Sequence, residues 1–391
     1  MKTSSFGNVL KKNMMVIALA VVVIFFSVST GGKILLPQNI TSLISQNGYV
    51  FVLATGMLLC ILTGGNIDLA VGSVVCFAGA IGAVLMDKGF PAILAAIVML
   101  VMGLAIGMFQ GYWIAWVSVP PFIATLAGMY AFRGLSNVVL QGLTVGINNT
   151  TFLNIFGGGA NCYVPDFFKG EGLNITCMAI GIIGVALYVI MTIRGMIVRK
   201  KRGFRIGVGD VFATLFKMII VSALILWIIY ELAQDRGIPS VLIWIALVLL
   251  VYGYITRNTA IGRYFYAVGG NEKATRLSGI NTKLVYFIAY ANMGMLAGLA
   301  GILTIARAKS SQPTYGQGYE MDAIAACFIG GASAYGGVGK ITGVIIGATL
   351  MGVINQGMAL MDMSANYQRA VKGVVLLVAV LIDVLSNKKQ S

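Results

Sequence analysis

Carboxylate and amide side chains beside paired glycines are the groups in this sequence whose type and spacing suggest chemistry. The stretch at 63–68 reads TGGNID and places Asp68 at the start of an apolar run. A carboxylate surrounded by lipid is costly, and it therefore marks a candidate functional site. Asp68 can equally cap a broken helix, because two glycines precede it and free backbone N–H groups follow it. The two interpretations are compatible, since irregular backbone inside a membrane is tolerated where it lines a water-filled cavity.

A similar arrangement recurs in the second half of the chain, where Asp322 lies near the start of another apolar run. A cysteine and a glycine follow each carboxylate, at Cys76 and Gly79 in the first half and at Cys327 and Gly330 in the second. The spacings differ between the halves, so the pattern gives only weak support for an internal repeat.

Side chains that serve most enzymes and metal sites are scarce. The sequence has no histidine, and its five cysteines show no CxxC spacing. A metal site therefore has no credible set of ligands, and no nucleophile, base and carboxylate form a catalytic constellation. We expect no enzyme activity and no metal on this chain. Cys162 and Cys177 flank one extramembrane loop, and whether they form a disulfide is left open.

The composition points to a membrane as the setting of these groups. Of 391 residues, 59% are hydrophobic and 10% are charged, and the mean hydropathy is +0.92. A soluble domain of this length would carry about 25% charged residues. The net charge of +15 falls mostly in loops between apolar runs, where membrane orientation explains it better than nucleic-acid binding does. We therefore predict an all-α polytopic membrane protein whose partner is the lipid bilayer and not nucleic acid.

Twelve apolar runs each meet or approach the roughly 20 residues that a helix needs to cross the hydrocarbon core. They predict roughly 12 transmembrane helices, with 10 to 12 as the range because the runs beginning near Leu69 and Met321 are short enough to be half-helices. The runs cover residues 14–30, 41–62, 69–86, 91–116, 120–140, 175–193, 211–233, 238–255, 284–306, 321–334, 341–361 and 367–385.

Basic residues in the short loops set the predicted orientation. If every run spans, the basic loop 194–210 and the segment 262–280 share one side with both termini, and this side is the cytoplasm. The loop 141–174 lies outside and carries only Lys169 against Asp166 and Glu171. We therefore expect a multi-pass protein with both termini cytoplasmic.

The segment 262–280 reads GRYFYAVGGNEKATRLSGI and builds a short helix outside the bilayer. Asn271 can cap this helix, Glu272 suits the positive end of its dipole, and Gly279 stands where a left-handed stop is wanted. A helix of about two turns is not stable alone in water, so it must pack on something. It is either an interfacial helix lying on lipid headgroups or a docking helix for another protein.

Several stretches, in the same order along most of the chain, resemble permeases of ATP-binding-cassette (ABC) importers for monosaccharides. Length and the extra pair of runs around 194–210 look most like the xylose-type and multiple-monosaccharide permeases. The stretches are GGNIDLAVGS at 64–73, VPPFIATLAGMYAFRG at 119–134, YAVGGNEKATRLSGIN at 266–281, MDAIAACFIGG at 321–331, YGGVGKITGVIIGA at 335–348 and NQGMALMDM at 355–363.

The resemblance implies a single permease domain over residues 1–391, in a bacterial cytoplasmic membrane. It implies a second permease copy, most simply as a homodimer, a soluble sugar-binding protein outside and cytoplasmic ATPase subunits inside. The chain has no G-x-x-x-x-G-K-[ST] phosphate loop, so ATP and Mg belong to the partner ATPase and no cofactor is expected here. Residues 262–280 then form the coupling segment. The residues expected to contact the ATPase are Asn271, Glu272, Ala274, Arg276, Leu277 and Gly279.

A sugar pathway needs aromatic faces for stacking and polar groups for hydroxyls. Each candidate is ambiguous, because Asn and Gln also bridge packed membrane helices. Asn66 is a departure, since members of the group commonly have an acidic residue or glycine there, and a shifted sugar preference would follow if the side chain faces sugar. The candidates are Asn66, Asp68, Phe122, Thr125, Tyr130, Asn292, Asn355 and Gln356.

Two other functions remain open at this point. An ABC permease for branched-chain amino acids or nucleosides would have a similar coupling segment. A secondary sugar symporter could also have about twelve spans, but it usually needs buried titratable groups in both halves, and this chain has few embedded acids. The sequence does not name the sugar, because a separate binding protein would do most of the selecting.

Overall fold

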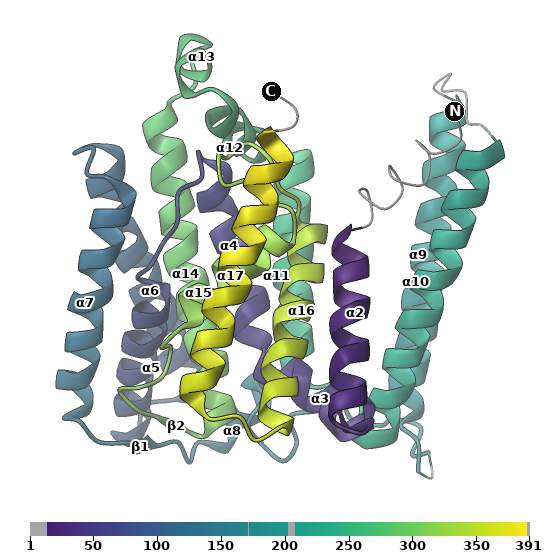
Figure 1. Cartoon of the computed structure of the whole chain (residues 1–391). Coiled ribbons are helices and arrows are strands. Elements are labelled where there is room, and N and C mark those ends of the chain that lie inside the picture. Colours follow the sequence, from purple (N-terminus) through teal and green to yellow (C-terminus); the bar gives the residue numbers. More distant parts are fainter. Residues whose placement is uncertain (1–13, 171, 202–207, 389–391) are drawn as a thin grey trace.

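A computed structural model describes residues 14–170, 172–201 and 208–388 of the chain. Helices form nearly all of the described structure, and most of them run side by side as one bundle (Figure 1). Their bounds are α2 Met14–Ser29, α3 Pro37–Gln46, α4 Gly48–Leu62, α5 Val71–Asp87, α6 Ala92–Ala115, α7 Pro121–Leu140, α8 Thr150–Phe156, α9 Ile175–Lys201, α10 Val208–Asp235, α11 Ser240–Asn258, α12 Ala260–Gly270, α13 Glu272–Leu277, α14 Thr282–Ala308, α15 Tyr319–Ile329, α16 Ile341–Leu360 and α17 Ala365–Lys388, with the short 3-10 helix η1 at Lys33–Leu35.

The core of the bundle is built around α4 and α14. Every residue of α4 is buried, and α14 packs against α4, α5 and α6. Close contact with α6 depends on glycine, because a Cβ at Gly107 would overlap the Tyr290 carbonyl and lie 2.9 Å from Gly294 Cα. Backbones that approach this closely gain van der Waals packing, which is the main attraction between helices in lipid.

Seven helices of the described chain are long and apolar enough to cross a membrane, and the bent pair α3 and α4 makes an eighth. The chain is therefore an all-α polytopic membrane protein. The twelve predicted runs all fall on helices, but twelve crossings are not confirmed. Helix α15 has 11 residues and is therefore about 16 Å long, which is the length of a half-helix.

The run 41–62 departs from the prediction of one helix, since the structure bends it by 41° between α3 and α4. Asn47 lies at the bend, and its Nδ2 donates to Leu43 O at 2.9 Å. An Asn side chain that bonds nearby backbone competes with the helical ladder, and the following Gly48 adds flexibility. The break was not predicted, because the run as a whole is apolar in composition.

The regions between the long helices are partly ordered. The loop 141–174 contains α8 and the short strand β1 (Val145–Gly146), which pairs antiparallel with β2 (Ser310–Ser311). The predicted basic loop 194–210 overlaps the end of α9 and the start of α10, and its residues 202–207 lie outside the described residues. Cys162 and Cys177 are both free thiols.

Candidate functional site

The segment 262–280 forms a short two-helix projection at one end of the bundle (Figure 1). Thr259 caps α12 by accepting from Gly262 N at 3.1 Å. Asn271 ends α12 and caps α13, because its Oδ1 accepts from Ala274 N at 2.9 Å. Gly279 has φ +84°, the left-handed conformation that ends a helix at low cost. The predicted cap and stop of this helix are confirmed.

Helix α13 is held by contacts within the chain. The Thr275 hydroxyl is buried and donates to Ala267 O and Asn271 O, both at 2.8 Å. On the other side, the Glu272 carboxylate accepts from Thr282 Oγ1 at 3.2 Å and from Tyr286 Oη at 3.1 Å. These bonds supply the packing that a helix of 6 residues lacks by itself.

The outer surface of α13 is free of contacts with the rest of the described chain at its tip. Leu277 is 88% exposed, which is unusual for a large apolar side chain. The six residues predicted to contact another protein are all exposed on this projection, namely Asn271, Glu272, Ala274, Arg276, Leu277 and Gly279. Leu277 is thus an exposed apolar side chain that follows the charged Arg276.

A hollow of about 440 Å³ lies beside the base of α13. One wall consists of Glu272, Arg276 and the start of α14, and the other is the turn between α6 and α7, which includes Ser118. Asn66 reaches this hollow, and its Nδ2 donates to Thr63 O at 3.2 Å. Asn66 therefore lies at the end of the bundle, beside α13.

Beneath α12, two glycine-rich loops touch through their backbones. Gly337 N donates to Leu62 O at 3.0 Å. Gly65 has φ +76°, and a Cβ there would overlap the Ala334 carbonyl. A Cβ at Gly269 of α12 would overlap Leu62 O. The loop after α4, the loop before α16 and the projection therefore meet at one junction, where side chains would not fit.

Asp68 lies in the break between α4 and α5 and is 2% exposed. Its Oδ1 accepts from Ala70 N at 2.8 Å, one residue before α5 begins. This hydrogen bond lies within the loop that leads into α5, and the start of α5 has no side-chain cap. Asp68 is not among the residues that line the hollow beside α13.

The other pathway candidates are spread over the bundle. Phe122 and Tyr130 are exposed on α7 by 54% and 70%. The buried Thr125 hydroxyl donates to Pro121 O at 2.9 Å, and Asn292 Oδ1 accepts from Tyr252 Oη at 2.8 Å. Gln356 is buried in α16. The structure therefore does not bring the eight predicted residues together around one passage.

A buried polar network gathers around Asp322 near the start of α15. Its Oδ2 accepts from Tyr49 Oη at 2.5 Å and from Lys372 Nζ at 2.9 Å. Asn355 Nδ2 lies 3.4 Å from the same oxygen and 3.0 Å from Asn47 Oδ1. Helices α4, α15, α16 and α17 are thus joined at one point. No group of three or more metal-ligand side chains occurs among the residues that the structure describes.

Comparison with known proteins places the chain in a sequence family. The family described as "Branched-chain amino acid transport system / permease component" matches residues 39–380. The chain belongs to this permease family. No solved structure matches it significantly.

Individual relatives of this permease are sugar-transport proteins by name. It is 38% identical to the xylose transport system permease protein XylH of Haemophilus influenzae, over 96% of each chain. It is 34% identical to XylH of Escherichia coli, over 96% of this chain and 92% of the relative. It is 35% identical to the ribose import permease protein RbsC of Escherichia coli, over 90% of this chain and 87% of the relative.

Two residues of the permease's polar network were missed in the sequence. Lys372 lies inside the apolar run 367–385, and Tyr49 lies inside the run 41–62. The position of Lys372 was a usable signal, because a lysine this far into a predicted span needs a carboxylate partner. Asp322 was singled out only as part of a weak repeat.

Proposed function

We propose that this chain is the membrane-spanning subunit of an ABC importer that moves a monosaccharide inward. The observation that carries the proposal is the similarity to xylose and ribose permeases along nearly the whole chain. The exposed docking helix α13 supports it, because a subunit without a nucleotide loop needs a partner to supply energy.

The energy comes from a separate ATPase that binds ATP and Mg and seats α13. Leu277 at the tip, with Ala274 and Arg276, is the surface offered to that partner. Helix α2 begins and α17 ends at the end of the bundle from which α13 projects (Figure 1), which supports a shared cytoplasmic side for both ends. The membrane is the bacterial cytoplasmic membrane, and the apolar runs account for up to twelve helical crossings.

The substrate is a pentose such as xylose, or a small group of aldoses. Branched-chain amino acids are the alternative, because the family description names them. The relatives of high identity and coverage carry the names of sugar transporters, and this favours sugar. A soluble binding protein selects the sugar outside, and a second copy of the permease completes the passage, since the candidate lining residues are dispersed in one copy.

Uptake into proteoliposomes tests this function. The permease is reconstituted with its ATPase and binding protein, and radiolabelled xylose, ribose and leucine are offered in turn. We expect uptake of a sugar that requires both ATP and the binding protein. Leucine uptake under these conditions would overturn the assignment of substrate. Sugar uptake driven by a proton gradient without ATP would overturn the ABC mechanism.

A further inference from the structure

Glu272 makes contacts that a residue facing only a partner protein does not need. Both oxygens of its carboxylate are engaged inside the chain, Oε1 by the Thr282 hydroxyl at 3.2 Å and Oε2 by the Tyr286 hydroxyl at 3.1 Å. Both donors belong to α14, whereas Glu272 is the first residue of α13. The carboxylate therefore joins two helices.

The charge of Glu272 also suits both helix starts. Glu272 lies in the first turn of α13, and Thr282 is the first residue of α14. Unsatisfied backbone N–H groups make each of these helix ends positive, so one carboxylate beside them is favourable. The backbone caps come from other residues, Asn271 for α13 and Asn281 for α14. Glu272 is thus free to bind the side chains of α14.

Helix α14 extends from this contact into the centre of the bundle. It has 27 residues, and 17 of them are buried. Helix α13 is fixed to α12 by Thr275 and to α14 by Glu272. The opposite wall of the hollow beside α13 is the α6–α7 turn. Glu272 therefore supplies the side-chain hydrogen bonds that join α13 to α14 beside this hollow.

We propose that Glu272 is a positioning residue that ties α13 to α14, so that movement imposed on α13 moves the central helix with it. The inference rests on the proposed function, in which an ATPase acts on α13. It separates two roles within the exposed segment. Leu277 provides the surface on which the partner sits, and Glu272 provides the connection through which the partner's movement enters the membrane.

The experiment compares docking with transport in the reconstituted importer. Glu272→Ala is predicted to lower sugar uptake per ATP hydrolysed about tenfold in importer that has its ATPase bound, because hydrogen bonds to a charged group are lost. Glu272→Gln should restore most of the ratio, since its amide can bond both hydroxyls. Lys283→Ala, which removes an exposed charge from the first turn of α14, is the matched control and should leave the ratio unchanged.

Tyr286→Phe gives a second test that removes one hydroxyl and keeps the ring, and it carries the test if Glu272→Ala does not reach the membrane. Its effect should not add fully to that of Glu272→Ala, because both remove the same contact. An unchanged ratio of sugar uptake to ATP hydrolysis in both Glu272→Ala and Tyr286→Phe would overturn the inference. Failure of the proposed function would look different, because the unmodified importer would then show no sugar uptake that requires ATP and the binding protein.

Discussion

Lys372 and Asp322 form an ion pair inside the bundle although they are 50 positions apart in the sequence. Lys372 Nζ lies 2.9 Å from Asp322 Oδ2, and the side chain of Asp322 is 0% exposed. The pair joins α17 to the short helix α15. Helix α15 has 11 residues, which is too short to cross the membrane alone, and this contact fixes it to α17.

Removing one member of this pair should destabilise the protein strongly. Lys372→Met leaves a buried carboxylate without its cation, which costs about 3 to 5 kcal/mol. The double variant Lys372→Met with Asp322→Asn should recover much of this loss, because no unpaired charge remains. Thermal unfolding in detergent measures both. The control is Arg369→Ala, whose exposed side chain contacts Gln317 on the surface, and its effect should stay within about 0.5 kcal/mol.

Equal melting temperatures for Lys372→Met and Arg369→Ala would contradict the ion pair as a structural element. A double variant less stable than Lys372→Met would contradict the explanation by unpaired charge.

Gly107 should tolerate no side chain, since α6 and α14 meet there through their backbones. A methyl group at Gly107 would overlap the Tyr290 carbonyl, and the helices would have to separate at a cost of about 1 to 3 kcal/mol. Gly134 on α7 is the matched control, because a Cβ there meets nothing within 4 Å. Gly134→Ala should be neutral or stabilising by up to about 1 kcal/mol. If Gly107→Ala and Gly134→Ala lowered the melting temperature of the protein in detergent equally, this result would contradict the close approach of α6 and α14.

The features that the sequence predicted correctly depend on neighbours along the chain. The cap by Asn271 and the stop at Gly279 follow from residues within one or two turns. The bend at Asn47 escaped prediction because hydropathy averages over a run and does not register a local competition for backbone hydrogen bonds.

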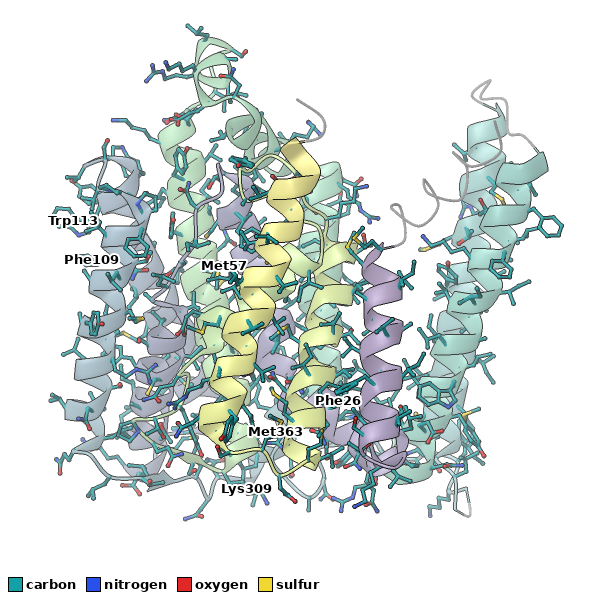
Figure 2. All side chains as sticks on the ribbon, in the orientation of Figure 1. Phe26, Met57, Phe109, Trp113, Lys309 and Met363 are labelled. Atoms are coloured by element: carbon teal, nitrogen blue, oxygen red, sulfur yellow. The ribbon has the colours of Figure 1, made fainter. Side chains whose placement is uncertain are left out.

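The features that escaped prediction depend on residues far apart in the sequence. Asn355 was chosen as a pathway residue, yet its Nδ2 lies within reach of Asn47 and Asp322 on other helices. Phe122 and Tyr130 were chosen for their rings, and both are exposed on α7. Figure 2 shows how side chains fill the spaces between the helices. The packing of the helices in the bundle determines which side chains contact one another, and the spacing of residues within one segment of the sequence does not.

Asp166 in the loop 141–174 should stabilise the start of α9 over a wide pH range. Hydrogen bonds from Gly170 N, the Thr176 side chain and backbone, and Phe168 N lower the pKa of Asp166 below its usual range. The carboxylate is thus still ionised in the folded loop at the ordinary pKa of about 3.9. Its stabilisation is complete above that value and is lost as the pH falls towards the lower folded pKa. Hydrogen exchange of the first turn of α9, corrected for intrinsic rates, should not change between about pH 5 and 8.

Asp166→Ala should accelerate exchange at Thr176, whose N–H bonds Asp166 Oδ1 at 3.1 Å. Asn161→Ala changes an exposed residue of the same loop and should leave that rate unchanged. A midpoint in the wild-type exchange profile at or above about pH 4 would contradict the lowered pKa.

Leu277 should determine whether the ATPase binds. It is 88% exposed at the tip of α13, and Leu277→Glu replaces its apolar contact with a charge that would be buried in the partner's cleft without a counter-ion. Truncation of a central anchor in an interface costs about 2 kcal/mol or more, and an unpaired charge adds to that. We expect co-purification of the ATPase to fall by at least about thirtyfold and sugar uptake to fall with it. Membrane abundance and melting temperature should stay unchanged, since Leu277 packs against little of its own chain.

Ser278→Ala is the control, because it alters the next exposed side chain, whose hydroxyl bonds Ala274 O at 3.0 Å within the same helix. Normal sugar-stimulated ATP hydrolysis by the Leu277→Glu importer would show that α13 is not the docking helix.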